Sequence, residues 1–317
     1  MTPETGRDAL RADAAMIERD SLHRFLIERT HVRGEWIHLD ATWNALCERA
    51  AYPAPVRNLL GEALAATALL SATIKFSGAL TLQVRGDGDV SLLVIQAQVG
   101  PARVGEAEGH GRRTLRGLAR WQGAPQAGSL ATLCGSGHMA LTIDPGRGGE
   151  RYQGIVALEG ECLADALHDY FERSEQLPTR LWLAAGEQGV AGLLLQALPG
   201  AVPDPDAWER TVALADTVTS AELLELSAEA LLHRLYHEED VRLFEREPVG
   251  FYCGCSRERV ADMLRGLGRQ ETRAILAEQG RIEVDCEFCG AHYGFDAVDA
   301  EAIFSAGDQP AMPRTEH

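Results

Sequence analysis

The spacing of apolar residues changes repeatedly along this chain, and each change predicts a different element of secondary structure. From residue 56 to residue 70, strong helix formers and apolar residues occupy nearly every side, which predicts a buried helix. Residues 74–76 and 80–84 then alternate apolar and polar side chains, as half-buried strands do. Further strands are predicted at residues 90–95, 141–143, 152–158, 181–183 and 192–198.

The predicted strands come mainly in pairs, with helices inserted between the pairs. Gly86-Asp87-Gly88-Asp89 lacks the third glycine and the following helix of a dinucleotide-binding loop, so a hairpin turn is predicted there. A helix is predicted at residues 162–173. This order favours an α+β domain with antiparallel sheets over a doubly wound α/β fold.

Prolines and glycine at residues 199–206 mark a boundary, because they interrupt regular structure. The pattern from residue 208 to residue 236 is helical, and Thr219 with Glu222 forms a capping box. Leucines lie on more sides of this segment than one narrow seam requires. They must therefore be buried against the first domain or against a partner.

The last part of the chain, from about Gly250, carries four cysteines, Cys253, Cys255, Cys286 and Cys289. Between the two pairs, Ser256 is a candidate N-cap for a helix with apolar residues at 260, 263, 264 and 267. A second helix is predicted at 271–278, ended by Gly280. Residues 293–295 are predicted to form a return strand, and the tail after about residue 305 is expected to be unstructured.

Bulk properties limit the classes of function. The chain has 317 residues, of which 45% are hydrophobic, and a formal net charge of −17. This charge disfavours non-specific binding of DNA or RNA, which requires a basic surface. No segment approaches the roughly 20 apolar residues of a membrane span, and the polar N-terminus lacks the apolar core of a secretory signal. A cytoplasmic protein with a mobile leader over residues 1–20 is expected.

The cysteine array has the spacing C-x-C, then thirty residues, then C-x-x-C. Four thiolates can hold one metal ion, and zinc is the metal most often bound by four sulfurs in a tetrahedron. Such a site leaves no open position for substrate, which indicates a structural role. Because thiolates can also be oxidised, the array is a candidate redox switch. The simpler alternative is four cysteines that bind nothing.

Other motifs have simpler interpretations. Cys134 lies four residues before His138, but closeness in sequence is weak evidence for a nucleophile and its base. A glycine-rich turn with a buried thiol is preferred. Cys47 and Cys162 lie in helical patterns and are predicted to be core thiols. The run that begins at His237 and continues Glu-Glu-Asp is predicted to be a solvated acidic helix end, in preference to a metal site.

Several longer strings, together with the cysteine array, resemble the 33 kDa chaperonin (heat-shock protein 33) family. They extend over about residues 22 to 303. The strings are residues 151–154 (Arg-Tyr-Gln-Gly), 169–180 (from Asp-Tyr-Phe-Glu-Arg to Leu-Pro-Thr-Arg), 235–239 (Leu-Tyr-His-Glu-Glu), 255–259 (Cys-Ser-Arg-Glu-Arg), 275–278 (Ile-Leu-Ala-Glu) and 289–293 (Cys-Gly-Ala-His-Tyr). Cys134 and Cys162 lie outside the family's switch pattern, so no role is carried over to them.

The resemblance implies an ATP-independent, redox-regulated chaperone and no enzyme. Its parts would be an α+β core at residues 21–199, a helical linker at 200–249 and a C-terminal zinc domain at 250–317. In the reduced form, one zinc ion would be held by the four cysteines. Oxidation would release zinc, form the disulfides Cys253–Cys255 and Cys286–Cys289, and unfold the zinc domain and the linker. The exposed apolar surface would then bind unfolding proteins, in a form associated with homodimers.

Two other classes of protein could contain the same four cysteines. A zinc-ribbon module would bind nucleic acid, which the net charge of −17 opposes. A thiol–disulfide oxidoreductase would use C-x-x-C directly. However, no thioredoxin-like βαβ pattern surrounds Cys286, and four ligating sulfurs are not available as nucleophiles.

Overall fold

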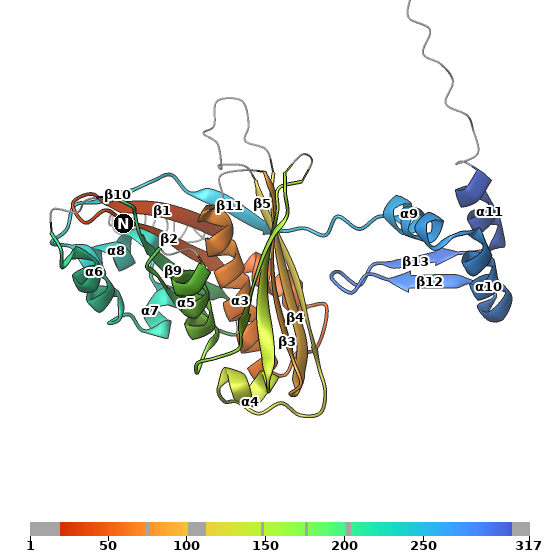
Figure 1. Cartoon of the computed structure of the whole chain (residues 1–317), viewed down its shortest axis with the longest axis horizontal. Helices are drawn as coiled ribbons and strands as arrows, with labels where there is room; N and C mark the ends of the chain where they lie inside the picture. The colour runs from red at the N-terminus through yellow and green to blue at the C-terminus, as the bar shows by residue number, and fades with distance from the viewer. Residues whose placement is uncertain are drawn as a thin grey trace, which may run out of the picture. The chain divides into compact units, whose positions relative to one another are not determined.

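The computed structural model describes residues 20–73, 77–100, 112–146, 149–174, 177–200 and 204–305. The chain divides into two compact units, with the boundary between Tyr252 and Cys253. The larger unit is built on an eleven-stranded sheet (Figure 1). The strands lie in the order β7-β6-β3-β4-β5-β11-β1-β2-β9-β8, and β10 also pairs with β1.

One half of this sheet consists of antiparallel strands, two of which alternate between buried and more exposed positions over most of their length. Residues 87–89 connect β3 to β4, so the predicted hairpin turn is confirmed. The strands predicted at 80–84, 90–95, 141–143 and 152–158 all lie in this half, to within one residue. Its members are β3 (Gly78–Gly86), β4 (Val90–Val99), β5 (Arg113–Trp121), β6 (Gly137–Asp144) and β7 (Tyr152–Ala157).

The other half contains the predicted pair at 181–183 and 192–198, together with two strands that were not predicted. Strand β2 escaped prediction because it is buried along almost its whole length, so it does not alternate. The interior positions of β2 include the polar residues Glu35 and His38. The strands of this half are β1 (Ser21–Ile27), β2 (Val32–Leu39), β8 (Thr179–Ala185) and β9 (Val190–Ala197).

Two short strands come from the segment that follows the helical linker. Strand β10 (Val241–Leu243) pairs with β1. Strand β11 (Glu247–Phe251) lies between β1 and β5 and thereby joins the two halves. It runs antiparallel to β1 and parallel to β5. This is the one parallel pairing among the described strands.

The predicted buried helix is α3 (Ala54–Thr73), and its apolar residues face the core on nearly every side. It packs against strands of both halves of the sheet, including β4, β8 and β9. The helix predicted at 162–173 is α5 (Leu163–Ser174). Two further helices, α2 (Ala41–Cys47) and α4 (Leu130–Cys134), were not predicted.

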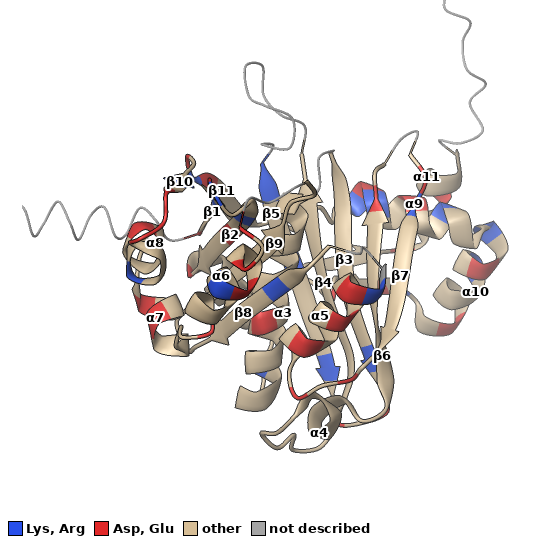
Figure 2. Ribbon diagram, turned by 60° about the vertical axis from the view of Figure 1, so that its left-hand side comes forward, with Lys and Arg blue, Asp and Glu red and all other residues tan. Residues whose placement is uncertain are grey.

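The segment predicted as helical from 208 to 236 forms three helices, α6 (Ala207–Ala215), α7 (Ser220–Glu225) and α8 (Ala228–Tyr236). The capping box of Thr219 and Glu222 is confirmed, and Ser227 caps α8. Their leucines form a buried cluster with residues of β1, β2 and β9. The sequence left open whether these leucines pack against the first domain or against a partner. The structure shows that they pack against the sheet of the larger unit. Acidic residues mark the outer side of α7 (Figure 2).

Up to residue 305, the smaller unit contains three helices and a two-stranded hairpin. The N-cap of α9 at Ser256 and the left-handed Gly280 after α10 are confirmed, with Gly280 at φ 75°. The final helix, α11, was not predicted. The elements are α9 (Arg257–Leu267), α10 (Arg269–Gln279), β12 (Ile282–Asp285), β13 (His292–Phe295) and α11 (Ala297–Ser305).

The α+β class with an antiparallel core is confirmed. The strand predicted at 74–76, the leader and the tail after 305 lie outside the described residues. None of the helices in the described part of the chain is both long and apolar enough to cross a membrane.

Candidate metal centre

The four clustered cysteines come from two places in the smaller unit. Cys253 and Cys255 precede α9, whereas Cys286 follows β12 and Cys289 precedes β13. The Sγ atoms of Cys253 and Cys286 are 3.6 Å apart, and those of Cys255 and Cys289 are 3.2 Å apart. All four sulfur atoms lie within 4.8 Å of one another. Folding therefore brings together two pairs that are thirty residues apart in sequence.

The second pair lies on a tight turn. The amides of Cys289 and Gly290 both donate to the carbonyl oxygen of Cys286, at 3.3 and 2.7 Å, and the Cys286 amide donates to the Ala291 oxygen at 2.9 Å. Gly290 has φ 69°, a left-handed conformation that favours glycine. The turn thus brings the Cys286 and Cys289 sulfurs to within 4.8 Å of each other.

The first pair is held by the start of α9 and by a tyrosine. The Ser256 side chain accepts a hydrogen bond from the Arg259 amide and so caps the helix. The Tyr293 hydroxyl donates to the Cys255 sulfur at 3.2 Å. This tyrosine was not predicted as part of the site, although it lies only four residues after Cys289. A hydroxyl aimed at a sulfur favours the thiolate, which is the ligand form.

The electrostatics of the four thiols differ. The hydrogen bond from Tyr293 lowers the pKa of Cys255 to about 7. Burial raises the pKa of Cys289 to about 12, and burial also raises the pKa of Cys286. The bond to Cys255 raises the pKa of Tyr293 to about 12. Four negative charges at these distances repel one another, so a cation is needed to stabilise them together.

The residues present fit a four-sulfur metal site. Zinc–sulfur bonds of about 2.3 Å in a tetrahedron place the sulfurs roughly 3.8 Å apart, close to the separations of 3.2 and 3.6 Å found here. No other group of at least three cysteine, histidine or carboxylate ligands gathers in this way among the described residues. Cys253, Cys255, Cys286 and Cys289 can therefore hold one metal ion.

The apolar support of this centre is small. Its buried cluster has five members, Ala261, Leu264, Ile282, Phe295 and Ile303. Arg257 lies over the Phe295 ring, 4.2 Å from its centroid. Met263 and Leu267, which share the helical spacing of the buried Leu264, are about half exposed. A core of this size supplies little folding free energy, so a bound metal would be a major stabilising contact.

The remaining cysteines lie in the larger unit. Cys134 is fully buried, and burial raises the pKa of its thiol to about 11. His138 is exposed on β6, so the interpretation as a turn with a buried thiol agrees with the structure. Cys47 is half-buried with a pKa raised by burial to about 11. The prediction for Cys162 is wrong, because it precedes α5 and its side chain is exposed.

The acidic run after α8 agrees with its interpretation as a solvated helix end. His237 is the C-cap of α8 and lies 4.0 Å from the Glu238 carboxylate. The side chains of His237 and Glu238 are 59% and 89% exposed.

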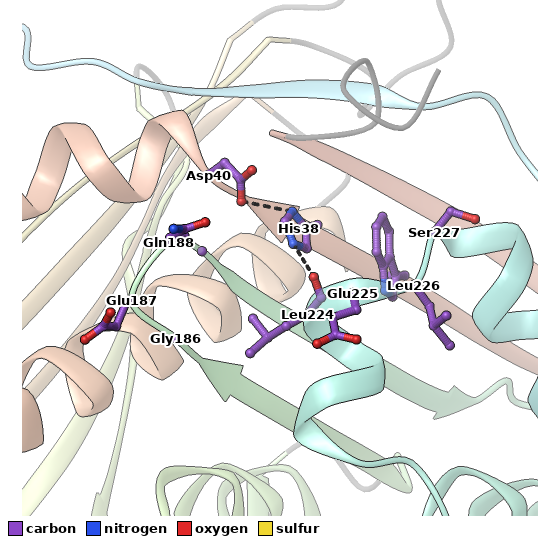
Figure 3. A pocket seen from close by; sticks show the side chains of 11 residues that line it. His38, Asp40, Gly186, Glu187, Gln188, Leu224, Glu225, Leu226 and Ser227 are labelled. Atoms are coloured by element: carbon purple, nitrogen blue, oxygen red, sulfur yellow. Dashed lines mark hydrogen bonds and ion pairs between the residues drawn. The ribbon is translucent and has the colours of Figure 1, made fainter. Parts of the chain in front are cut away.

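A second polar site, which sequence reasoning missed, connects the linker helices to the sheet. His38 of β2 contacts the carbonyl oxygen of Leu224, at the end of α7, through Nε2 at 3.0 Å. Its Nδ1 lies 3.5 Å from the Asp40 carboxylate. These residues line a cavity of about 500 Å³ between β2, the β8–β9 turn and the α7–α8 junction (Figure 3). The contact ties the linker directly to the core.

Comparison with known proteins agrees with the family resemblance that the sequence motifs indicated. A family model described as Hsp33 protein matches residues 20–296. The 33 kDa chaperonin of Nitrosococcus oceani is 53% identical over 302 residues, which covers 95% of this chain and all of the relative. That of Methylobacillus flagellatus is 47% identical, over 90% of this chain and 94% of the relative. The crystal structure of the 33 kDa chaperonin from Thermotoga maritima has a TM-score of 0.72 at 21% identity and covers 91% of this chain and all of its own, which supports the fold.

Proposed function

This chain belongs to the Hsp33 protein family, and on that basis we propose that it is a redox-regulated, ATP-independent holdase chaperone. Membership of a chaperone family implies that it binds unfolded client proteins. The observation that carries the regulatory part of the proposal is the cluster of four sulfurs within 4.8 Å, in a unit whose buried core has five residues.

In the reduced form, Cys253, Cys255, Cys286 and Cys289 hold one zinc ion as thiolates, and the chaperone is inactive. The Tyr293 hydroxyl, 3.2 Å from the Cys255 sulfur, supports a ligand from outside the coordination sphere. The bound metal stabilises the smaller unit by neutralising charges that would otherwise oppose its folding.

Oxidation converts the four thiolates into two disulfides. In each, two thiolates lose two electrons as a sulfur–sulfur bond forms, and hydrogen peroxide with two protons becomes two water molecules. We propose the pairs Cys253–Cys255 and Cys286–Cys289. All four sulfurs lie within 4.8 Å of one another in the folded unit. Disulfides between partners one or two residues apart close only short loops, so they are compatible with the unfolding that follows, whereas disulfides between partners thirty residues apart would cross-link the unfolded unit. Disulfides are no longer zinc ligands, so the metal leaves.

Loss of the metal unfolds the smaller unit and destabilises the linker that precedes it. The linker helices bury Leu223, Leu231, Leu232 and Leu235 against β1, β2 and β9. Release of the linker exposes two apolar surfaces at once, the leucine-rich face of the linker helices and the face of the sheet that they cover. Such a surface binds the apolar segments of unfolding proteins without any nucleotide. The active form is proposed to be a homodimer that works in the cytoplasm.

The test is peroxide treatment of the purified zinc-loaded protein at mildly elevated temperature. We expect one zinc ion per chain to be released, four thiols to be lost, and aggregation of a model client to be suppressed. Peptide mapping should identify the two proposed disulfides. A matched control with Cys134 changed to Ala keeps the switch, because Cys134 is buried in the larger unit. Release of zinc with no effect on client aggregation would contradict the chaperone proposal.

A further inference from the structure

Strand β11 joins the two halves of the large sheet (Figure 1). It ends at Phe251, two residues before Cys253, the first cysteine of the metal centre. Its pairing is short. Two of its residues pair with β1, and three pair in parallel with β5. Pro248 has no amide hydrogen to donate. The rest of this edge of β1 is covered by β10, at Phe25, Leu26 and Ile27. On the other side, β11 pairs with only three of the nine residues of β5, so β1 and β5 form a slot that a short segment fills.

A buried charge cluster fixes β11 in this slot. The Glu247 carboxylate is 2.9 Å from an Arg24 nitrogen and also accepts a hydrogen bond from Arg113. Arg113 is fully buried, and burial lowers its pKa to about 9. Glu35, buried on β2, interacts electrostatically with both arginines. Loss of the Glu247 carboxylate would therefore remove an acidic partner from the fully buried Arg113 and from Arg24, whose side chain is 19% exposed.

The side chains of β11 alternate between the two faces of the sheet. Glu247 and Val249 are buried, whereas Pro248 is exposed. Phe251 is half-buried beneath the guanidinium of Arg49, which lies 5.7 Å from its ring centroid. The slot thus accepts an extended segment with an acidic residue, then an apolar residue two positions later, then an aromatic residue two positions after that. Such a pattern occurs in strands of many proteins, and in an unfolded client it is exposed.

We propose that β11 leaves the sheet together with the linker, and that an extended client segment carrying a carboxylate takes its place between β1 and β5. The inference rests on the proposed function, in which the segments on both sides of β11 unfold. The client would gain main-chain hydrogen bonds from both neighbours, as in β-strand addition. Its carboxylate would restore the buried contacts of Arg24 and Arg113. Non-specific apolar contacts to the linker surface would add to this binding.

The test uses a fluorescent peptide with the sequence of residues 245–252 and the full-length protein. Anisotropy should show binding to the oxidised, zinc-depleted form and none to the reduced zinc form, where the slot is filled. The peptide should also compete with a model client. A peptide with Glu247→Gln should bind at least about tenfold more weakly, because a charge-assisted hydrogen bond is lost. The matched control, Pro248→Ala, alters an exposed position and should bind equally well.

A second measurement does not depend on variant folding. Bound peptide should slow hydrogen exchange of the β5 amides near Leu115, where β11 is paired in the reduced form. If the oxidised protein suppresses aggregation but the peptide neither binds nor competes, this inference is wrong and the chaperone function stands. If the oxidised protein fails to suppress aggregation at all, the proposed function itself fails. Should the peptide block dimer formation and leave client binding intact, the slot serves a second copy of the chain and the client assignment is overturned.

Discussion

Glu62 is a partly buried carboxyl group whose ionisation should make the stability of the larger unit depend on pH. It lies on the buried helix α3, beside cavities lined by Leu59, Leu163 and Leu223. Burial raises its pKa to about 7, well above the ordinary glutamate value. As pH rises, the unfolded chain therefore loses this proton first. The ionisation of Glu62 therefore does not reduce the free energy of unfolding below about pH 4.5. Between about pH 4.5 and pH 7 this free energy falls progressively as pH rises.

Glu62→Gln should remove this pH dependence. We expect the variant to be more stable than the parent by about 2 kcal/mol at pH 8, and to show little gain at pH 4.5. Urea unfolding followed by tryptophan fluorescence measures this, because all five tryptophans lie in the larger unit. Glu187→Gln, at a position 86% exposed, is the control and should change little. An unchanged stability at pH 8 would show that Glu62 is solvated.

Tyr293 supports the metal centre from outside the four sulfurs. Removing its hydroxyl with Tyr293→Phe should weaken zinc binding about tenfold, because the thiolate of Cys255 loses a hydrogen-bond donor. Competition with a chromophoric chelator measures the affinity. Tyr252→Phe is a close control, since Tyr252 precedes Cys253 and its side chain is 60% exposed. Equal affinities for the two variants would show that the hydroxyl contributes nothing to metal binding.

The cysteine spacing was sufficient to predict which four side chains meet, because few geometries satisfy C-x-C and C-x-x-C around one centre. Tyr293 and His38 were not predictable in the same way. Each contacts an atom that its position in sequence does not identify, the Cys255 sulfur for Tyr293 and the Leu224 carbonyl for His38. Cys162 was wrongly assigned to the core, since its residue type favours burial but its place before α5 leaves it exposed.

At the scale of elements, local pattern identified the structures whose contacts are local. The β3–β4 hairpin could be predicted because one face of each strand is apolar. Helix α3 could be predicted because nearly every face is apolar over many residues. Strand β11 could not, because it is five residues long, contains Pro248 and is held by distant strands. The linker was predicted to be helical, with a helix start at the capping box of Thr219, which the structure confirms. The second division, at Ser227, which caps α8, was not predicted.

The packing of α8 on the sheet should set the threshold for activation. Leu231 is fully buried in the cluster that joins the linker to β1, β2 and β9. Leu231→Ala should destabilise this packing by about 2–4 kcal/mol. Client binding should then begin at lower oxidant concentration or lower temperature. Aggregation assays over a series of peroxide concentrations provide the measurement.

His233→Ala is the matched control for this helix, because His233 is exposed on α8. It should leave the threshold where it is. If Leu231→Ala and His233→Ala respond alike to peroxide, release of the linker is not the step that limits activation.

The two units of the whole molecule differ in how they are stabilised. The larger unit has two extensive apolar clusters, while the smaller unit combines five buried residues with four clustered thiols. A ligand that binds only the folded state raises stability in proportion to the logarithm of its concentration. Zinc should therefore raise the unfolding temperature of the smaller unit and of the linker helices that depend on it, and leave that of the rest of the larger unit unchanged. Calorimetry at several free zinc concentrations should resolve one transition that moves and one that does not.

Tryptophan fluorescence can then test whether loss of the metal centre is transmitted to the linker. Trp36, Trp182 and Trp208 lie in or against the cluster that the linker helices cover, and the smaller unit has no tryptophan. If unfolding of the smaller unit releases the linker, peroxide should shift the emission to longer wavelength as these rings become hydrated. The shift should follow zinc release in time and reverse when thiols and zinc are restored. Zinc loss with unchanged emission would mean that the linker stays packed on the sheet. The metal centre would then not control exposure of the apolar surface that the linker helices cover.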